Sequence, residues 1–120
     1  MTWKMFLDDV REVTGIYPNA APDEYVVCRS VFDAFAEIQM RGMPYFISFD
    51  HDLGIIPGTT IVSETGFDFA KSLVAQDLDE TINIPKHFSF KVHSANPIGS
   101  NNITCLLTSY LNYRNNNELS

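Results

Sequence analysis

The sequence predicts one α/β domain, in which a four-stranded parallel sheet carries helices on both faces. Short apolar segments alternate with segments of helical periodicity, which is typical of parallel strands joined by crossover helices. Residues 45–49 are apolar at nearly every position, as expected for a central strand that is covered on both sides. Polar clusters follow three of the strands, and the carboxyl ends of parallel strands are where such folds bind ligands.

Strands are expected at residues 3–7, 25–28, 45–49 and 88–92, in the spatial order 2-1-3-4. The last strand alternates apolar and polar residues, and Lys91 needs to reach water, so we expect this strand at an edge of the sheet. Residues 10–24 contain Gly15, Pro18 and Pro22 without a helical period. They indicate a long irregular connection where a first crossover helix would otherwise lie.

Three helices are expected, one after each of the last three strands. Ser30 begins the first, and Thr65 begins the second with Asp68 three residues later, as in a capping box. The apolar stripes expected to face the sheet are Val31, Phe35 and Ile38, then Phe67, Ala70, Val74 and Leu78, then Ile103, Leu106, Leu107, Tyr110 and Leu111. Residues 1–114 would form the domain and residues 115–120 a solvated tail.

The composition is that of a globular protein that binds neither duplex DNA nor membranes. Apolar residues make up 45% of the 120 residues, and the formal net charge of −7 repels a phosphate backbone. No apolar run reaches the roughly 18–20 residues that span a bilayer, and acids at positions 8 and 9 come too early for a signal peptide. Cys28 and Cys105 lack metal-ligand spacing, so we expect reduced core thiols in a cytoplasmic protein.

Aspartates follow two neighbouring core strands: Asp8 and Asp9 after the first, Asp50 and Asp52 after the third. Carboxylates that converge cannot all stay ionised without a nearby cation, and Mg²⁺ or Mn²⁺ suits such hard oxygen ligands. The alternative is that these acids only end the strands and cap the loops. Two acidic clusters on consecutive core strands favour the metal site.

His51 and His93 each follow a strand, and each could exchange a proton with a substrate near neutral pH. An isolated histidine is more often a surface or hydrogen-bonded residue, so it is the pair at neighbouring strand ends that points to catalysis. Arg11 and Arg29 carry guanidinium groups that match a phosphate with two hydrogen bonds. Either arginine could instead pair with surface carboxylates.

The segment that opens the last helix offers backbone N–H groups to a phosphate. Asn96, Gly99 and Asn102 lie there, and we expect them to line a ligand. The phosphate-binding signatures G-x-x-x-x-G-K-[ST] and G-x-G-x-x-G are absent, as is the G-x-S-x-G of serine hydrolases.

In this order the motifs resemble those of the cyclic-phosphate processing receiver-like family, small relatives of the response-regulator receiver domain found in phages and bacteria. The matching segments are F-L-D-D-V-R (6–11), C-R (28–29), I-S-F-D-H-D-L-G (47–54), T-G-F-D (65–68) and H-S-A-N-P-I-G (93–99), with Asn102 just after them. The resemblance implies a truncated receiver or flavodoxin-like fold of three layers. The chain ends after the fourth α/β unit, so the fifth strand of receivers and its lysine are missing.

The resemblance also implies where a ligand would sit. Receivers hold Mg²⁺ with an acid pair after the first strand and an aspartate after the third, and Asp8, Asp9 and Asp50 stand in those places. Ser94 matches the hydroxyl residue that contacts the phosphoryl group, and Thr65 lies in another matched segment and joins the expected substrate-binding residues. The missing lysine argues against phosphorelay signalling, whereas the added histidines and arginine suit a phosphoesterase.

Taken together, residues and resemblance predict a metal-dependent phosphoesterase that hydrolyses a small cyclic-phosphate nucleotide, an ADP-ribose cyclic phosphate or an RNA cyclic-phosphate end. Water or Asp50 would attack the phosphorus, His93 would protonate the leaving oxygen, and His51 would orient the site. Two alternatives stay open: a phage-type module that sequesters a signalling nucleotide, and a degenerate receiver used for protein interaction. In each case we expect a cytoplasmic protein, in the host cytoplasm if a phage encodes it.

Overall fold

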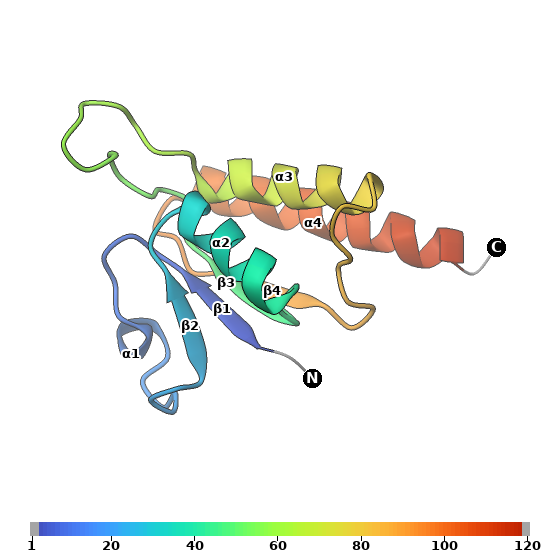
Figure 1. The fold of residues 1–120 in the computed structure, drawn as a ribbon, viewed down its shortest axis with the longest axis horizontal. Helices are drawn as coiled ribbons and strands as arrows, with labels where there is room; N and C mark the ends of the chain where they lie inside the picture. Colours follow the sequence, from blue (N-terminus) through green and yellow to red (C-terminus); the bar gives the residue numbers. More distant parts are fainter. Residues whose placement is uncertain (1–2, 119–120) are drawn as a thin grey trace.

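Four short parallel strands form the centre of the computed structural model, which describes residues 3–118 (Figure 1). They are β1 (Lys4–Leu7), β2 (Tyr25–Cys28), β3 (Phe46–Phe49) and β4 (Ser89–Val92). Their order across the sheet is β2-β1-β3-β4, and every neighbouring pair is parallel. The predicted strand order and the edge position of the last strand are confirmed.

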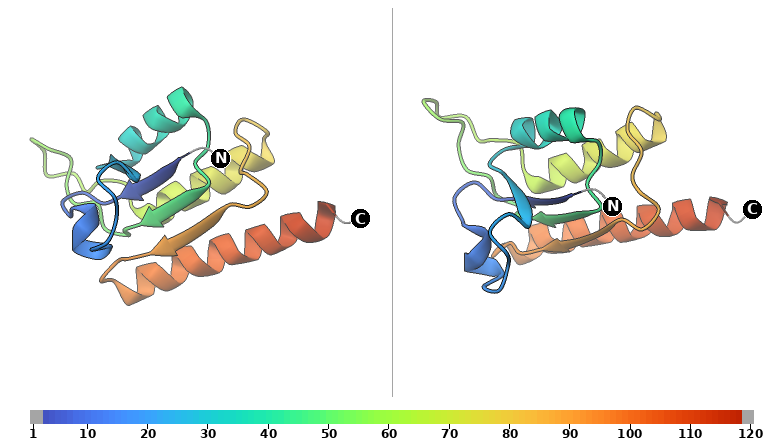
Figure 2. Two further views of the ribbon diagram at one scale, coloured as in Figure 1. Left: turned by 90° about the horizontal axis from the view of Figure 1, so that it is seen from below. Right: turned by 60° about the horizontal axis from the view of Figure 1, so that its bottom comes forward.

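The helices are α1 (Val13–Ile16), α2 (Val31–Arg41), α3 (Gly66–Leu78) and α4 (Pro97–Glu118). The helices α2 and α3 cover one face of the sheet, and α4 packs beside α3 and β4 (Figure 2). The other face carries only the four-residue α1 and its flanking loop, so the helices on the two faces are unequal. Among residues 3–118, no helix combines the length and hydrophobicity needed to cross a membrane.

The hydrophobic core lies between the sheet and the three long helices. Met5, Leu7, Ile47 and Phe49 alternate along β1 and β3 and are completely buried. The helices contribute the buried side chains Val31, Ala34, Ile38, Phe69, Ala70, Leu73, Ile103, Leu107 and Tyr110.

The predicted apolar stripe of α3 is correct in part. Ala70 is completely buried and Phe67 and Val74 pack against the core, whereas Leu78 is exposed. The stripe left out Phe69 and Leu73, which are completely buried. Thr65 and Asp68 form the predicted capping box at the start of the helix. The ring of Phe69 then meets the ring of Phe49 from β3.

Three other expectations change in detail. The helix α4 continues to Glu118, so residues 115–118 of the expected tail are helical, and residues 119–120 lie outside the described part of the chain. Both cysteines are free, but only Cys28 is a core thiol, since Cys105 is exposed on α4. The connection between β1 and β2, expected to be irregular, contains the short α1.

Candidate metal and phosphate site

Three aspartates converge at the carboxyl ends of β1 and β3. One carboxylate oxygen from each of Asp8, Asp9 and Asp50 can be chosen so that all three lie within 4.8 Å of one another. The register explains the convergence, because Leu7 pairs with Phe49 and the next residue of each strand is an aspartate. Asp8 is completely buried and Asp50 is 8% exposed, so these carboxylates are held by the fold.

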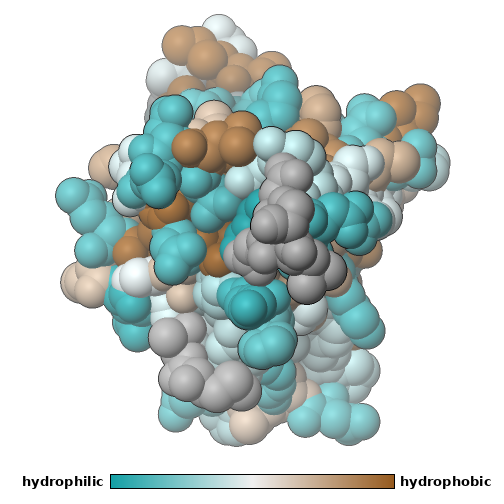
Figure 3. All heavy atoms as spheres, turned by 90° about the vertical axis from the view of Figure 1, so that its right-hand side faces the viewer, coloured by the Kyte–Doolittle hydropathy of each residue, from teal (hydrophilic) through white to brown (hydrophobic). Residues whose placement is uncertain are grey.

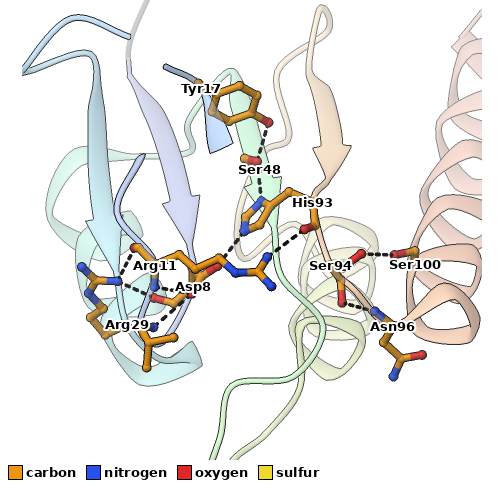
Figure 4. A network of polar contacts seen from close by, with 10 residues as sticks. Asp8, Arg11, Tyr17, Arg29, Ser48, His93, Ser94, Asn96 and Ser100 are labelled. Carbon is orange, nitrogen blue, oxygen red and sulfur yellow. Dashed lines mark hydrogen bonds and ion pairs between the residues drawn. The ribbon is translucent and has the colours of Figure 1, made fainter. Parts of the chain in front are cut away.

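Asp8 organises the loop that follows β1. Its Oδ1 accepts hydrogen bonds from the backbone N–H groups of Val10 (3.0 Å) and Arg11 (2.8 Å). Arg29 closes the same loop, because its Nη1 donates to the carbonyl oxygens of Asp8 (3.1 Å) and Arg11 (2.6 Å) (Figure 4). Its Nη2 pairs with Glu12 at 3.2 Å. These contacts engage Arg29 with the protein itself and favour a structural role over the expected phosphate contact.

A buried chain of hydrogen bonds reaches Asp8 from the opposite side (Figure 4). The Nε2 atom of His93 lies 3.0 Å from Asp8 Oδ2, and its Nδ1 lies 2.7 Å from Ser48 Oγ. Ser48 Oγ lies 2.7 Å from the hydroxyl of Tyr17. The His93 ring stacks parallel to Phe6 with 4.7 Å between centroids, and its side chain is only 4% exposed.

The protonation states follow from the surroundings. Burial lowers the pKa of His93, although Asp8 opposes the shift, so the imidazole is neutral near pH 7. Burial works to raise the pKa of Asp8, but the N–H groups of Arg11 and Val10 and the bond from His93 outweigh it and hold that pKa below its usual value. An ionised Asp8 accepts from His93 Nε2–H, so His93 Nδ1 accepts from the Ser48 hydroxyl. The Ser48 oxygen accepts in turn from Tyr17.

Asp50 behaves in the opposite way to Asp8. Burial, and then the charge of Asp8, raise the pKa of the Asp50 carboxyl, and the nearby His93 and the hydrogen bonds from His51 N–H and Ser94 only partly offset them. Burial and the neighbouring carboxylate therefore both disfavour the ionised form of Asp50. Three carboxylate oxygens of this kind are the donors that Mg²⁺ and Mn²⁺ prefer, so the residues fit a divalent cation.

The fourth predicted metal ligand, Asp52, is not brought to this group. Its exposed carboxylate bonds His51 Nδ1 at 2.8 Å and accepts from Asn96 Nδ2 at 3.4 Å. The His51 ring lies against the start of α4, where a Cβ atom on Gly99 would come within 2.3 Å of it. His51 and Asp52 therefore form a second pair beside the acid cluster.

Residues 3–109 match the family model of the cyclic-phosphate processing receiver domain. The chain belongs to the cyclic-phosphate processing receiver domain family. A comparison with curated proteins found no match. Among solved structures, NtrX from Brucella abortus is similar, with 15% sequence identity and a TM-score of 0.44 over 99% of this chain. The chain spans 29% of the length of that NtrX chain.

Several polar groups of this receiver-like domain that were expected to bind substrate are used by its own helix starts. Thr65 Oγ1 accepts from the Asp68 N–H, as the cap of α3. Asn96 Oδ1 accepts from the Gly99 N–H (2.9 Å), so this donor of the expected phosphate cradle is already engaged. Asn102 is exposed on α4.

Arg11 and Ser94 remain closer to the expected site. Arg11 Nη1 donates to the carbonyl oxygen of His93 at 3.2 Å, so the guanidinium bridges from the β1 loop to the end of β4. Ser94 hydrogen-bonds to Asp50 and accepts the Asn96 N–H at 3.1 Å. Both residues therefore lie beside the carboxylates, although the protein uses them in its own hydrogen bonds as well.

Three residues that shape the site were not among the predicted site residues: Ser48, Tyr17 and Gly66. A serine in an otherwise apolar central strand was the available signal for Ser48, which is completely buried. Gly66 opens α3 directly over β3, and a Cβ atom there would lie 1.9 Å from the carbonyl oxygen of Asp50. Its N–H donates to the carbonyl of His51 at 2.8 Å, so the absence of a side chain lets α3 rest on the residues that follow β3.

Proposed function

We propose that the domain is a divalent-metal-dependent phosphoesterase that opens a small cyclic phosphodiester, such as a nucleoside 2′,3′-cyclic phosphate or the corresponding RNA end. The observation that carries the proposal is the convergence of Asp8, Asp9 and Asp50, where one carboxylate oxygen from each lies within 4.8 Å of the other two. The family name points to the same class of substrate.

The three aspartates would hold the cation. When bound, it would supply positive charge that draws electrons from the phosphorus and balances the charge of the transition state. Arg11 lies beside the cluster and adds a second positive charge next to the phosphate.

Hydrolysis requires a water oxygen to bond to phosphorus while one ring P–O bond breaks. The leaving ribose oxygen takes a proton from the enzyme, the attacking water loses one to solvent, and the product is a phosphate monoester with a free hydroxyl. The contacts of the two histidines support His51 as the donor, because Asp52 holds its Nδ1 and so orients the ring. His93 is better suited to position Asp8, because both of its ring nitrogens are engaged and its side chain is buried.

This assignment reverses the roles expected from sequence and can be tested directly. His51→Ala is expected to lower turnover by about 100-fold or more with ligand affinity within a few-fold, as for a lost proton donor. His93→Ala is expected to lower Mn²⁺ affinity by about 10–100-fold, as for a group that orients a metal ligand. The opposite result, a His93→Ala protein with normal Mn²⁺ affinity and strongly reduced turnover, would restore the assignment made from sequence.

The metal requirement is tested with Asp50→Asn and a matched control. We expect ³¹P NMR to show conversion of 2′,3′-cyclic AMP to a monoester with Mn²⁺ present and none with EDTA. Asp50→Asn should lose both turnover and calorimetric Mn²⁺ binding, whereas Asp79→Asn, the same change at the exposed end of α3, should keep both.

Unchanged Mn²⁺ affinity in Asp50→Asn would contradict the metal site. A wild-type protein that binds the nucleotide without converting it would instead identify a sequestering module.

A further inference from the structure

We infer that a hollow beside Asp9 binds the heterocyclic base of the nucleotide, an inference that rests on the proposed function and specifies its substrate. The hollow has a volume of about 620 Å³ and lies between the loop after β1, the start of α2 and the loop at 53–64. Asp9 lines this hollow and is also a member of the acid cluster, so the two sites adjoin at this residue.

Apolar side chains make up part of the walls of the hollow. Val10, Phe32, Ile55 and Ile56 line it, and all four are among the exposed large hydrophobic side chains. Phe32, for example, is 72% exposed, although it follows the N-cap of α2 by only two residues. Apolar side chains that gather around one hollow next to a polar site are typical of a ligand-binding surface.

The loop that forms one wall is held together by hydrogen bonds within the loop. Ile55 and Val62 form an antiparallel bridge, and the N–H of Ile56 donates to the carbonyl of Ile61 at 2.9 Å. Figure 1 shows this loop extending from the carboxyl end of the sheet, past the start of α2. The wall is therefore a hairpin-like structure with its own hydrogen bonds.

The charges around the hollow indicate which part of a nucleotide fits. Asp9, Asp33 and Glu64 line it together with Arg29, whose guanidinium bonds the β1 loop and Glu12. Three carboxylates repel a phosphate, so the phosphate would lie at the cation and not in the hollow. A base is neutral, it presents amino and ring N–H donors to carboxylates, and its flat face can stack on a phenylalanine ring.

A second hollow of similar size does not offer these features. It measures about 650 Å³, lies between the ends of α2 and α3, and is lined by neutral residues that include Phe35, Met43 and Ile82. Figure 3 views this end of the molecule, where hydrophobic surface lies among hydrophilic side chains. It is remote from the acid cluster, since it lies where strands begin.

The test compares ligands with and without a base. We expect the wild type with Mn²⁺ to bind or convert 2′,3′-cyclic nucleotides at least about 10-fold better than glycerol 1,2-cyclic phosphate, which has no base. Phe32→Ala should remove most of that preference and leave the response to the glycerol compound unchanged. Met40→Ala is the matched control, since Met40 is equally exposed at the other end of α2 and does not line the hollow.

The outcomes separate this inference from the proposed function. Equal binding or conversion of the cyclic nucleotides and of glycerol 1,2-cyclic phosphate would overturn the base site without contradicting the proposed phosphoesterase activity. If no cyclic phosphate is bound or converted, the proposed function fails, and NMR titration with adenosine, guanosine, cytidine and uridine decides the base site alone. Nucleoside binding that Phe32→Ala weakens and Met40→Ala does not would support it, whereas no binding by any nucleoside would overturn it.

Discussion

A buried carboxylate lies near each end of the sheet, and the two have very different surroundings. Asp77, in the last turns of α3, belongs to the end where strands begin. Its Oδ1 accepts from the Ile84 N–H at 2.8 Å, and its Oδ2 accepts from the Tyr110 hydroxyl at 2.5 Å and lies 3.5 Å from Arg114. The protein supplies both the hydrogen bonds and the positive charge that this carboxylate needs.

Asp8, where β1 ends, also has its hydrogen bonds satisfied, but these hydrogen-bond partners do not supply a positive charge to balance the carboxylate. Its partners are two backbone N–H groups and a neutral histidine, and Asp9 and Asp50 lie beside it. Asp77 therefore joins α3 to α4 within the fold, whereas Asp8 belongs to a cluster of three carboxylates. The comparison distinguishes an ion pair that joins two helices from the group that we propose to hold a cation.

The largest effect is expected where α3 rests on the carboxyl end of β3. Gly66→Ala would place a methyl group 1.9 Å from the Asp50 carbonyl oxygen, and the nearest atoms that it would meet belong to the backbone of Asp50 and His51. We expect this variant to lose about 4 kcal/mol of unfolding free energy, at the upper end of single substitutions. Gly15→Ala is the control, since a Cβ atom there meets nothing within 4 Å. Similar melting temperatures for the two variants would show that the packing around Asp50 is loose.

The next largest loss of stability is expected at Asp77, near the end of the sheet where the strands begin. Asp77→Asn should lose about 2–3 kcal/mol of unfolding free energy in urea titration, because it removes the negative charge that faces Arg114 and weakens the hydrogen bonds from Tyr110 and Ile84. Burial, and then the bond to Asp77, raise the pKa of Tyr110 to about 12. The stabilisation from that bond is thus present below pH 10 and is lost as the pH rises through about 12. A variant with wild-type stability would contradict the structural role of Asp77.

The sequence predicts the strands and the acid cluster because both depend on local patterns. The apolar segment 45–49 and the aspartates directly after two core strands place Asp8 and Asp50 side by side once the strands are parallel. The complete burial of Phe69 and Leu73, the use of Arg29 by the β1 loop and the engagement of His93 by Ser48 depend on contacts between distant segments. Composition and periodicity carry no trace of such contacts, so these features emerge only from the fold.

Within the acid cluster, two substitutions are expected to change the stability of the protein in opposite directions. In EDTA at pH 7, Asp50→Asn should raise stability, because the raised pKa of Asp50 means that its ionised form is disfavoured in the folded state. Asp8→Asn should lower stability by about 1–2 kcal/mol, because the amide loses charge-assisted hydrogen bonds.

The pH dependence of these variants follows from the same shifts. The advantage of Asp50→Asn should shrink as the pH falls, since protonation of the wild-type carboxyl gives the same neutral state. The stabilisation from Asp8 is present above its unfolded pKa of 3.8 and is lost as the pH falls through its lower folded value. Thermal melts of both variants between pH 2 and pH 8 would measure the two trends, and changes of equal sign would contradict the division of roles in the cluster.

The smallest effect tests the hydrogen-bond chain that supports Asp8. Tyr17→Phe removes only the first hydroxyl, and Ser48 can still donate to His93, so we expect a loss of about 1 kcal/mol and Mn²⁺ affinity within a few-fold. Ser48→Ala removes the donor to His93 Nδ1 and should weaken Mn²⁺ binding by about 10-fold through a less ordered ring. Tyr113→Phe, on the exposed side of α4, is the control for a lost hydroxyl.

Nitrogen chemical shifts of the His93 ring provide the decisive measurement for this chain. With Tyr17 and Ser48 in place, Nε2 should be protonated and Nδ1 unprotonated at pH 7, because an ionised Asp8 accepts from Nε2. Ser48→Ala should allow exchange between the two neutral tautomers, whereas Tyr17→Phe should not. If neither variant changes the ring shifts, Asp8 alone fixes the tautomer, and the serine inside the central strand serves packing and not the site.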